Sequence, residues 1–204
     1  MSVRILVMAK APVPGRVKTR LCPPWTPEQA AGLAAAALAD TLDVVTGSAA
    51  AERVLVVDGF YPAPPGWRTS SQRGGPLGER LANAFADHDA PALLIGMDTP
   101  QLTAATLDQA MWSLTRADAV LGPAADGGWW LLGLRRREYA EVLRDIPTST
   151  PETGAMTLEA LRRQGLRVTA LPVLRDVDTA DDAYAVAGGC PPRSRFARAV
   201  AAAR

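Results

Sequence analysis

Residues 3–21 read VRILVMAKAPVPGRVKTRL and decide the fold, because they join a short apolar run to a loop rich in proline and basic residues. The run Val3–Ala9 has the length and composition of a strand buried on both faces of a parallel sheet. Two prolines and Gly15 follow, so the strand ends there and a loop begins. In open sheets of this kind, ligands bind beyond the carboxyl ends of the strands. The sequence therefore predicts a first strand that leads into a cationic loop beside a ligand site.

The rest of the chain alternates apolar runs with helical patterns. Further strands are predicted at Arg53–Asp58, Pro91–Gly96, Asp118–Leu121, Trp129–Leu134 and Leu166–Leu171, with a short one near Arg68–Ser71 inside the Pro- and Gly-rich segment 59–76. Helices are predicted at Pro27–Gly47, Leu77–His88, Thr103–Leu114, Glu138–Arg144, Thr157–Gly165 and Thr179–Ala187, and the Ala-rich segment Arg193–Arg204 is either a docked helix or a frayed one. The alternation predicts one α/β domain, residues 1–204, with a mostly parallel central sheet and helices on both faces.

The composition argues against several classes of protein. The chain has 204 residues, 48% of them hydrophobic, which is enough for one well-buried core. Its 22 basic and 21 acidic residues nearly cancel, so it lacks the charge expected of a protein that coats nucleic acid or an anionic membrane. Two distant cysteines do not suggest a disulfide framework or a zinc site. With no signal peptide, and no apolar run of the roughly 20 residues that span a membrane, a cytoplasmic location is expected.

Four cations crowd the loop after the first strand, namely Lys10, Arg16, Lys18 and Arg20. They repel one another unless an anion joins them, and Gly15 allows the backbone to approach a ligand closely. A di- or triphosphate is therefore the expected ligand, and a solvated basic loop is the alternative. The loop differs from the known phosphate-binding motifs. Val17 stands where G-x-x-x-x-G-K-[ST] requires glycine, and the G-x-G-x-x-G fingerprint of dinucleotide sites is missing.

Carboxylates follow two of the other predicted strands. Asp98 comes three residues after Ile95, at the end of the predicted strand, and a carboxylate there costs desolvation unless it caps a helix, pairs with a cation or binds a metal. Thr103 is a better cap for the next helix, so Asp98 facing the cationic loop suits Mg²⁺ or Mn²⁺. Asp176 and Asp178 precede a later helix, where capping explains them well. Of these two, we favour Asp178 as a second metal ligand.

The turn Asp126-Gly127-Gly128 separates two predicted strands and leads into Trp129 and Trp130. Such a turn often has no function beyond reversing the chain. Aromatic faces stack on sugars or bases, but neighbours in a strand point to opposite faces, so at most one tryptophan lines a site and the other belongs to the core. We expect Gly127, Gly128 and Trp129 to contact substrate, and Asp126 to orient or deprotonate an acceptor hydroxyl.

Five segments, AKAPVPGRVKTRL, PLGERL, GMDTPQL, GPAADGGWWLLGL and RDVDTADD, occur in order between residues 9 and 182. Together they resemble a bacterial family of small GT-A glycosyltransferases that includes the arsenosugar-biosynthesis group, and more distantly the molybdenum-cofactor and phospholactate nucleotidyltransferases. The resemblance implies the nucleotide-diphospho-sugar transferase fold. It also implies that Lys10, Gly15, Lys18 and Arg20 hold phosphates, that Asp98 holds the metal, and that Asp126-Gly127-Gly128 contacts the transferred or accepting group. Ala9, Thr19, Gly78 and Arg80 are further expected nucleotide contacts, although a plain junction between loop and helix explains Gly78 and Arg80 as well.

The leading hypothesis is a glycosyltransferase that depends on Mg²⁺ or Mn²⁺ and uses a nucleotide-diphosphate sugar. A nucleotidyltransferase would use the same residues with a nucleoside triphosphate and a phosphorylated substrate, releasing pyrophosphate. A nucleotide-binding module without turnover is the third hypothesis. The expected partners are a nucleotide sugar or nucleoside triphosphate and a small-molecule acceptor, with neither nucleic acid nor membrane. The sequence leaves the base, the sugar, the acceptor and the oligomeric state open, a homodimer included.

Overall fold

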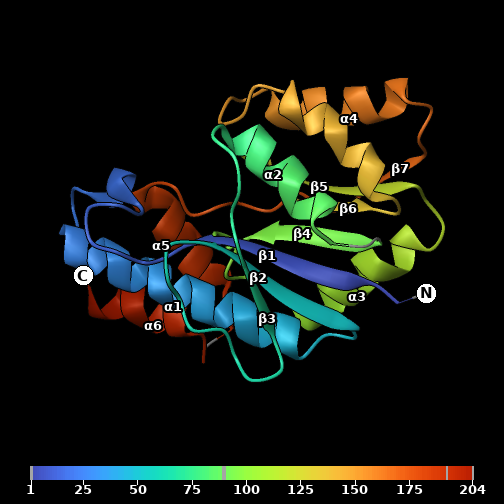
Figure 1. The fold of residues 1–204 in the computed structure, drawn as a ribbon. Coiled ribbons are helices and arrows are strands. Elements are labelled where there is room, and N and C mark those ends of the chain that lie inside the picture. Colours follow the sequence, from blue (N-terminus) through green and yellow to red (C-terminus); the bar gives the residue numbers. More distant parts are fainter. Residues whose placement is uncertain (1, 89–90, 192, 204) are drawn as a thin grey trace.

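A seven-stranded sheet forms the centre of the computed structural model, which describes residues 2–88, 91–191 and 193–203 (Figure 1). The strand order is β3-β2-β1-β4-β6-β5-β7. The strands are β1 (Arg4–Lys10), β2 (Glu52–Asp58), β3 (Arg68–Ser71), β4 (Ala92–Gly96), β5 (Ala119–Pro123), β6 (Trp129–Leu134) and β7 (Val168–Ala170). Within the described residues, β6 pairs antiparallel with β4 and β5, whereas the other pairings are parallel. The predicted mostly parallel sheet is confirmed.

Helices cover both faces of this sheet, as predicted (Figure 1). On one face lie α1 (Pro27–Thr46) and α3 (Ala104–Leu114), and on the other lie α2 (Leu77–Ala86), the 3₁₀ helix η2 (Arg137–Arg144) and α4 (Thr153–Arg163). A third layer packs on the outer side of α1 and contains the short 3₁₀ helix η1 (Thr19–Leu21), α5 (Ala180–Gly189) and α6 (Arg195–Ala202). The part of the chain that the structure describes has no helix with the length and hydropathy needed to span a membrane.

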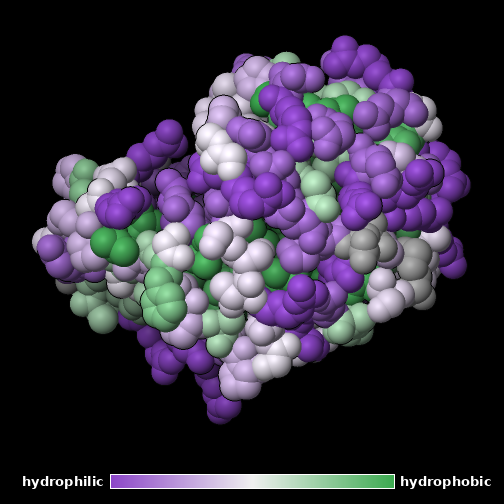
Figure 2. All heavy atoms as spheres, in the orientation of Figure 1, coloured by the Kyte–Doolittle hydropathy of each residue, from purple (hydrophilic) through white to green (hydrophobic). Residues whose placement is uncertain are grey.

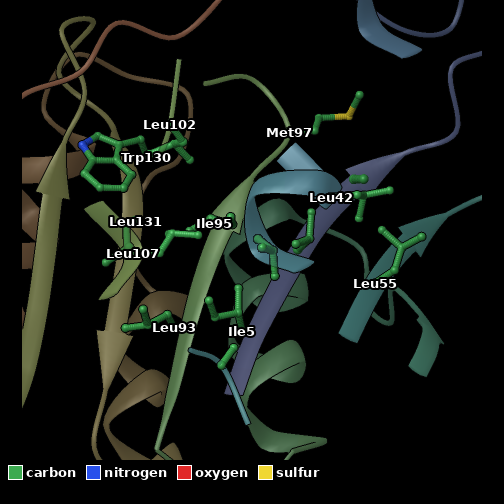
Figure 3. Close-up of a cluster of buried hydrophobic side chains, with 14 of the residues drawn as sticks. Ile5, Leu42, Leu55, Leu93, Ile95, Met97, Leu102, Leu107, Trp130 and Leu131 are labelled. Carbon is green, nitrogen blue, oxygen red and sulfur yellow. The ribbon is translucent and has the colours of Figure 1, made fainter. Parts of the chain in front are cut away.

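Alternating side chains of the strands enter two separate apolar cores. Ile5 and Val7 of β1 join the core beneath α1 and α3, whereas Leu6 and Met8 join the core beneath α2, η2 and α4. Figure 3 shows the first core, in which Leu93 and Ile95 of β4 lie near Ile5. Burying an aliphatic side chain of this size contributes about 1.5–3 kcal/mol. Because both faces of β1 and β4 are buried, these strands are fixed and their carboxyl ends can position polar groups.

One predicted helix begins at a different residue, and the structure decides between the two alternatives for the terminal segment. The predicted helix 157–165 begins four residues earlier, at Thr153, because Gly154 N donates a 2.8 Å hydrogen bond to Gly127 O and ties the start of α4 to a distant turn. Of the docked and the frayed helix predicted for the terminal segment, the structure has the docked one, α6. Asp40 of α1 accepts hydrogen bonds from Ser194 Oγ at 2.7 Å and Phe196 N at 2.9 Å, which fixes the start of α6.

Candidate active site

A cleft of about 560 Å³ opens where β1 and β4 end and β6 begins. Figure 2 shows the surface hollowed between the part of the molecule that carries α2 and α4 and the end that carries α5. Its lining comes from the loop after β1, the start of α2, the turn after β4, the turn before β6, and the segments 148–153 and 176–178. This is the edge at which ligands bind in open α/β sheets.

Lys18 lies at the centre of the charged groups in this cleft. Its side chain is 9% exposed, and its Nζ lies 2.8 Å from Asp98 Oδ1 and 3.1 Å from Asp178 Oδ1. The ammonium also donates a hydrogen bond to the carbonyl of Val177. Burial lowers the pKa of Lys18, but the charges of Asp98 and Asp178 outweigh burial and raise the pKa above its ordinary value. Three distant parts of the chain therefore converge on one ammonium that stays protonated.

Asp176 is the carboxylate of the cleft whose buried negative charge is least offset by hydrogen bonds and cations. Its Oδ1 is buried and has no hydrogen-bond partner among the described residues. Burial, followed by the charges of Asp98 and Asp126, raises the pKa of Asp176 to about 7, and Lys18 only partly opposes them. Near neutral pH this site therefore favours either a proton or an additional cation.

The donor chemistry of the cleft fits a hard divalent cation. Asp98, Asp176 and Asp178 all line it, and carboxylate oxygens are the ligands that Mg²⁺ and Mn²⁺ prefer. The buried, unpartnered Oδ1 of Asp176 gives such a cation a ligand that nothing else satisfies. Yet no three Asp, Glu, His or Cys side chains of the described chain are already grouped as a metal site. The ammonium of Lys18 instead lies between Asp98 and Asp178.

The remaining cations of the loop after β1 face solvent at the rim of the cleft. Lys10 and Arg16 are exposed, and the Arg20 side chain is 72% exposed with its Nη1 3.6 Å from Asp178 Oδ2. Exposed pairs of this kind contribute little to stability. These three side chains therefore remain available to an anion that enters the cleft.

The turn before β6 is joined to the segment 147–154. Gly127 has φ +90°, and a Cβ there would lie 1.9 Å from the carbonyl oxygen of Pro151, so this position requires glycine. Asp126 is exposed, and its Oδ1 accepts a 2.9 Å hydrogen bond from Gly128 N, which shapes the turn. Thr148, Ser149, Thr150 and Thr153 of the joined segment add hydroxyl groups to the lining. The turn and this segment form one side of the cleft.

Trp129 and Trp130 point to opposite faces of β6, as predicted. Trp129 is partly exposed, lines the cleft and packs against the core beneath α2. Trp130 is 2% exposed, belongs to the core beneath α1, and its Nε1 donates to Pro172 O at 3.1 Å. Trp130 also borders the cleft. Trp129 therefore offers an aromatic face, whereas Trp130 has a mainly structural role.

Arg80 in the first turn of α2 lines the cleft together with Gln72, a residue that the sequence did not predict for the site. Arg80 Nη1 donates to Gln72 Oε1 at 3.0 Å, and Gln72 Nε2 donates to Ala9 O at 2.8 Å, so Gln72 links Arg80 to the end of β1. Gln72 follows the short strand β3 directly, so its position at a strand end is the signal in the sequence that points to it. Gly78 lies elsewhere, since a Cβ there would be 2.3 Å from Leu143 O in the contact between α2 and η2.

A protein-family model matches residues 30–150, which is more than half of the chain. The chain belongs to the DUF2064 family. The family is described as uncharacterized proteins conserved in bacteria, so membership by itself assigns no activity. No protein with a curated description matches this DUF2064 chain.

Solved structures resemble this DUF2064 protein over almost its whole length. One from Desulfovibrio desulfuricans G20, provisionally described as a nucleotide-diphospho-sugar transferase, is 28% identical with a TM-score of 0.88, over 99% of this chain and 95% of the other. CMP:2-keto-3-deoxy-manno-octonic acid synthetase with CTP is 14% identical, with a TM-score of 0.57 over 91% and 97% of the two chains. Rv0371c of Mycobacterium tuberculosis H37Rv with manganese is 21% identical, with a TM-score of 0.57 over 91% and 98%. The last two establish the fold alone, and the predicted GT-A-like fold is confirmed.

Most of the site residues predicted from sequence share the cleft of this DUF2064 protein. The lining includes Ala9, Lys10, Lys18, Thr19, Arg20, Arg80, Asp98, Asp126, Gly128, Trp129 and Asp178. Within the described chain, Gly15, Gly78 and Gly127 are not part of the lining. Gly78 and Gly127 serve close backbone contacts instead, and Gly15 has φ +74° in open space. The roles expected for all of these residues in binding or catalysis stay predictions.

Proposed function

We propose that this protein is a nucleotide-dependent transferase that takes its transferred group from a nucleotide-diphosphate sugar. The observation that supports this most is the contact of Lys18 with both Asp98 and Asp178 inside a cleft whose rim carries Lys10, Arg16 and Arg20. A polyphosphate and its metal ion bind side by side, so the basic residues that bind the one and the carboxylates that bind the other must line the same cleft. The similarity to the Desulfovibrio desulfuricans protein adds support for the donor class.

The residues of the cleft have distinct tasks in this proposal. Exposed Lys10 and Arg20 receive the diphosphate of the donor, and their charge stabilises it as the bond to the sugar breaks. Asp98 and Asp178 are the residues that would hold Mg²⁺ or Mn²⁺, which when bound neutralises the diphosphate leaving group. These tasks are electrostatic.

The acceptor side of the cleft is formed by the turn before β6 and the segment joined to it. The aromatic face of Trp129 packs against a sugar ring, and the hydroxyl groups of Thr148 and Ser149 offer hydrogen bonds to it. Asp126 accepts the proton of the acceptor hydroxyl as that oxygen bonds to the anomeric carbon, and the nucleoside diphosphate departs with the electrons of the broken bond.

The proposal is tested by a thermal-shift screen of nucleotides and nucleotide sugars with Mn²⁺, followed by product analysis with the ligands that bind. A ligand at 100 times its Kd stabilises the folded state by about 2.7 kcal/mol, which such a screen detects. Release of a nucleoside diphosphate from a nucleotide sugar supports the proposal. Release of pyrophosphate from a nucleoside triphosphate and a phosphorylated substrate would replace it with nucleotidyl transfer, and tight binding without turnover would indicate a binding module. Failure of every nucleotide to raise the melting temperature would refute it.

Three expectations from the sequence accompany this proposal as predictions. They are the single domain over residues 1–204, the cytoplasmic location, and an oligomeric state that is either a monomer or an assembly such as a homodimer. Gel filtration with light scattering of the purified chain measures the last of these.

A further inference from the structure

The ammonium of Lys18 already occupies the place of a counter-ion in the acidic part of the cleft. It is within 3.1 Å of carboxylate oxygens of both Asp98 and Asp178, and a hydrogen bond to the carbonyl of Val177 holds it there. Its 9% exposure means that water contributes little to its solvation, so these partners replace the lost hydration. A lysine whose only role was to bind phosphate could remain exposed to solvent and would need neither this burial nor these carboxylate partners.

We propose that Lys18 excludes a divalent cation from the carboxylates of Asp98 and Asp178 until a polyphosphate pairs with the Lys18 ammonium in their place. The donor would then bind before the metal. The inference rests on the proposed function, because it assigns an order to the binding of the two ligands named there. Its basis is that the ammonium already lies against one oxygen of each of the two carboxylates, Asp98 and Asp178, that a dication would need.

The charges in the cleft explain why the dication alone is disfavoured. A dication placed against Asp98 and Asp178 would repel the ammonium at contact distance and deprive it of two ionic partners while it stayed buried. Asp176 adds a third carboxylate whose buried Oδ1 is unpartnered, but it does not remove that repulsion. The dication therefore competes with a cation that is covalently part of the site.

A polyphosphate changes this balance because it offers Lys18 a replacement anion. Lys10 and Arg20 at the rim attract the phosphates to the loop that carries Lys18 itself. Once the ammonium pairs with a phosphate oxygen, Asp98 and Asp178 lose their counter-ion and, together with Asp176, favour a dication. The same lysine thus prevents metal binding in the free protein and favours it after the donor has bound.

The first test measures Mn²⁺ binding to the nucleotide-free protein by the electron paramagnetic resonance signal of free Mn²⁺. Wild type, Lys18→Met and Lys18→Gln are compared with Arg20→Met, which removes an exposed cation paired to the same Asp178. The two Lys18 variants should bind Mn²⁺ about tenfold more tightly or better, because a buried unit charge at contact distance has been removed. Arg20→Met should change the affinity by less than about threefold. Adding Asp98→Asn to Lys18→Met should abolish the gain, and equal or weaker binding by both Lys18 variants would overturn the proposal.

A second test uses wild-type protein and so does not depend on whether the variants fold. Lysine ammonium signals are followed by ¹H–¹⁵N NMR, with the Lys18 signal assigned from its absence in Lys18→Gln or, if that variant does not fold, from its slow exchange with water. Inorganic pyrophosphate in EDTA should shift this signal, and Mg²⁺ alone at the same concentration should not. A shift caused by Mg²⁺ alone would show that the metal enters first. These experiments use no nucleotide, so their failure leaves the nucleotide screen untouched, and failure of that screen leaves the Mn²⁺ affinities interpretable.

Discussion

Asp176→Asn should stabilise the protein in mildly alkaline solution and have less effect in acid. The pKa of Asp176 is raised from its ordinary value of 3.8 to about 7, mainly by burial and then by Asp98 and Asp126. Below about pH 4 the folded and unfolded states both carry the proton, so the group favours neither. Between about pH 4 and pH 7 the folded state holds the proton and the unfolded state has released it, so stability falls as pH rises. Above about pH 7 the full cost of the buried carboxylate remains.

The magnitude follows from the difference between the two pKa values. The difference is about three pH units, and each unit corresponds to about 1.36 kcal/mol, which gives at most ~4 kcal/mol. Because Asp176 borders a cleft open to solvent, screening reduces this, and we expect about 2 kcal/mol. For a chain of this length, about 2 kcal/mol raises Tm by roughly 4–8 °C.

The assay is urea unfolding of wild type and Asp176→Asn with EDTA present, at about pH 8 and about pH 5. The variant should be about 2 kcal/mol more stable at the higher pH, and less than half of that gain should remain at the lower pH. Asp126→Asn changes an exposed carboxylate of the same cleft and should shift stability by under about 0.5 kcal/mol at both pH values. Equal gains for Asp176→Asn at both pH values, or a loss at the higher one, would refute the reasoning.

Three substitutions test contacts that support the cleft, each by urea unfolding. Gly127→Ala should cost about 3 kcal/mol or more, because its Cβ would lie 1.9 Å from the carbonyl oxygen of Pro151; unchanged stability would mean that the turn moves freely. Asp40→Ala removes the acceptor of hydrogen bonds of 2.7, 2.9 and 3.0 Å at the start of α6 and should cost about 3 kcal/mol, with faster amide exchange in α6 than in α1; equal exchange would contradict this. Gly78→Ala should cost about 2 kcal/mol, because its Cβ would lie 2.3 Å from Leu143 O, yet leave the nucleotide affinity of the folded protein unchanged; a selective loss of affinity would restore the nucleotide role expected from sequence.

The strands and most helices could be predicted because their local patterns and their burial agree. The run Val3–Ala9 differs from β1 by one residue at each end, and the short strand expected near Arg68–Ser71 is β3. The direction of β6 could not be predicted, since Trp129–Leu134 is apolar on both faces and a fully buried strand looks the same in either direction. The early start of α4 depends on a contact with Gly127, which no local pattern contains.

The residues that line the cleft could be predicted where their place after a strand decides that they lie at this edge of the sheet. The position of Lys18, Asp98 and Asp178 in segments that follow strands predicts that they share one cleft, because parallel strands bring their carboxyl ends to one edge. The inward direction of Lys18 was not predictable, since a lysine in a loop rich in proline is ordinarily solvated. The sequence favours Asp178 over Asp176 as a metal ligand but gives no sign that Asp176 Oδ1 is buried without a partner, because that burial arises from tertiary packing.

The most direct test of the central claim is a crystal structure of the wild-type protein grown with Mn²⁺ and the nucleoside diphosphate that stabilises it most in the thermal-shift screen, with the manganese located by anomalous scattering. The account predicts a manganese peak against Asp98 and Asp178, the diphosphate between that peak and the loop of Lys10 and Arg20, and the ammonium of Lys18 on a phosphate oxygen. A nucleotide bound away from this cleft, or in it with Lys18 still paired to both carboxylates, would contradict the account.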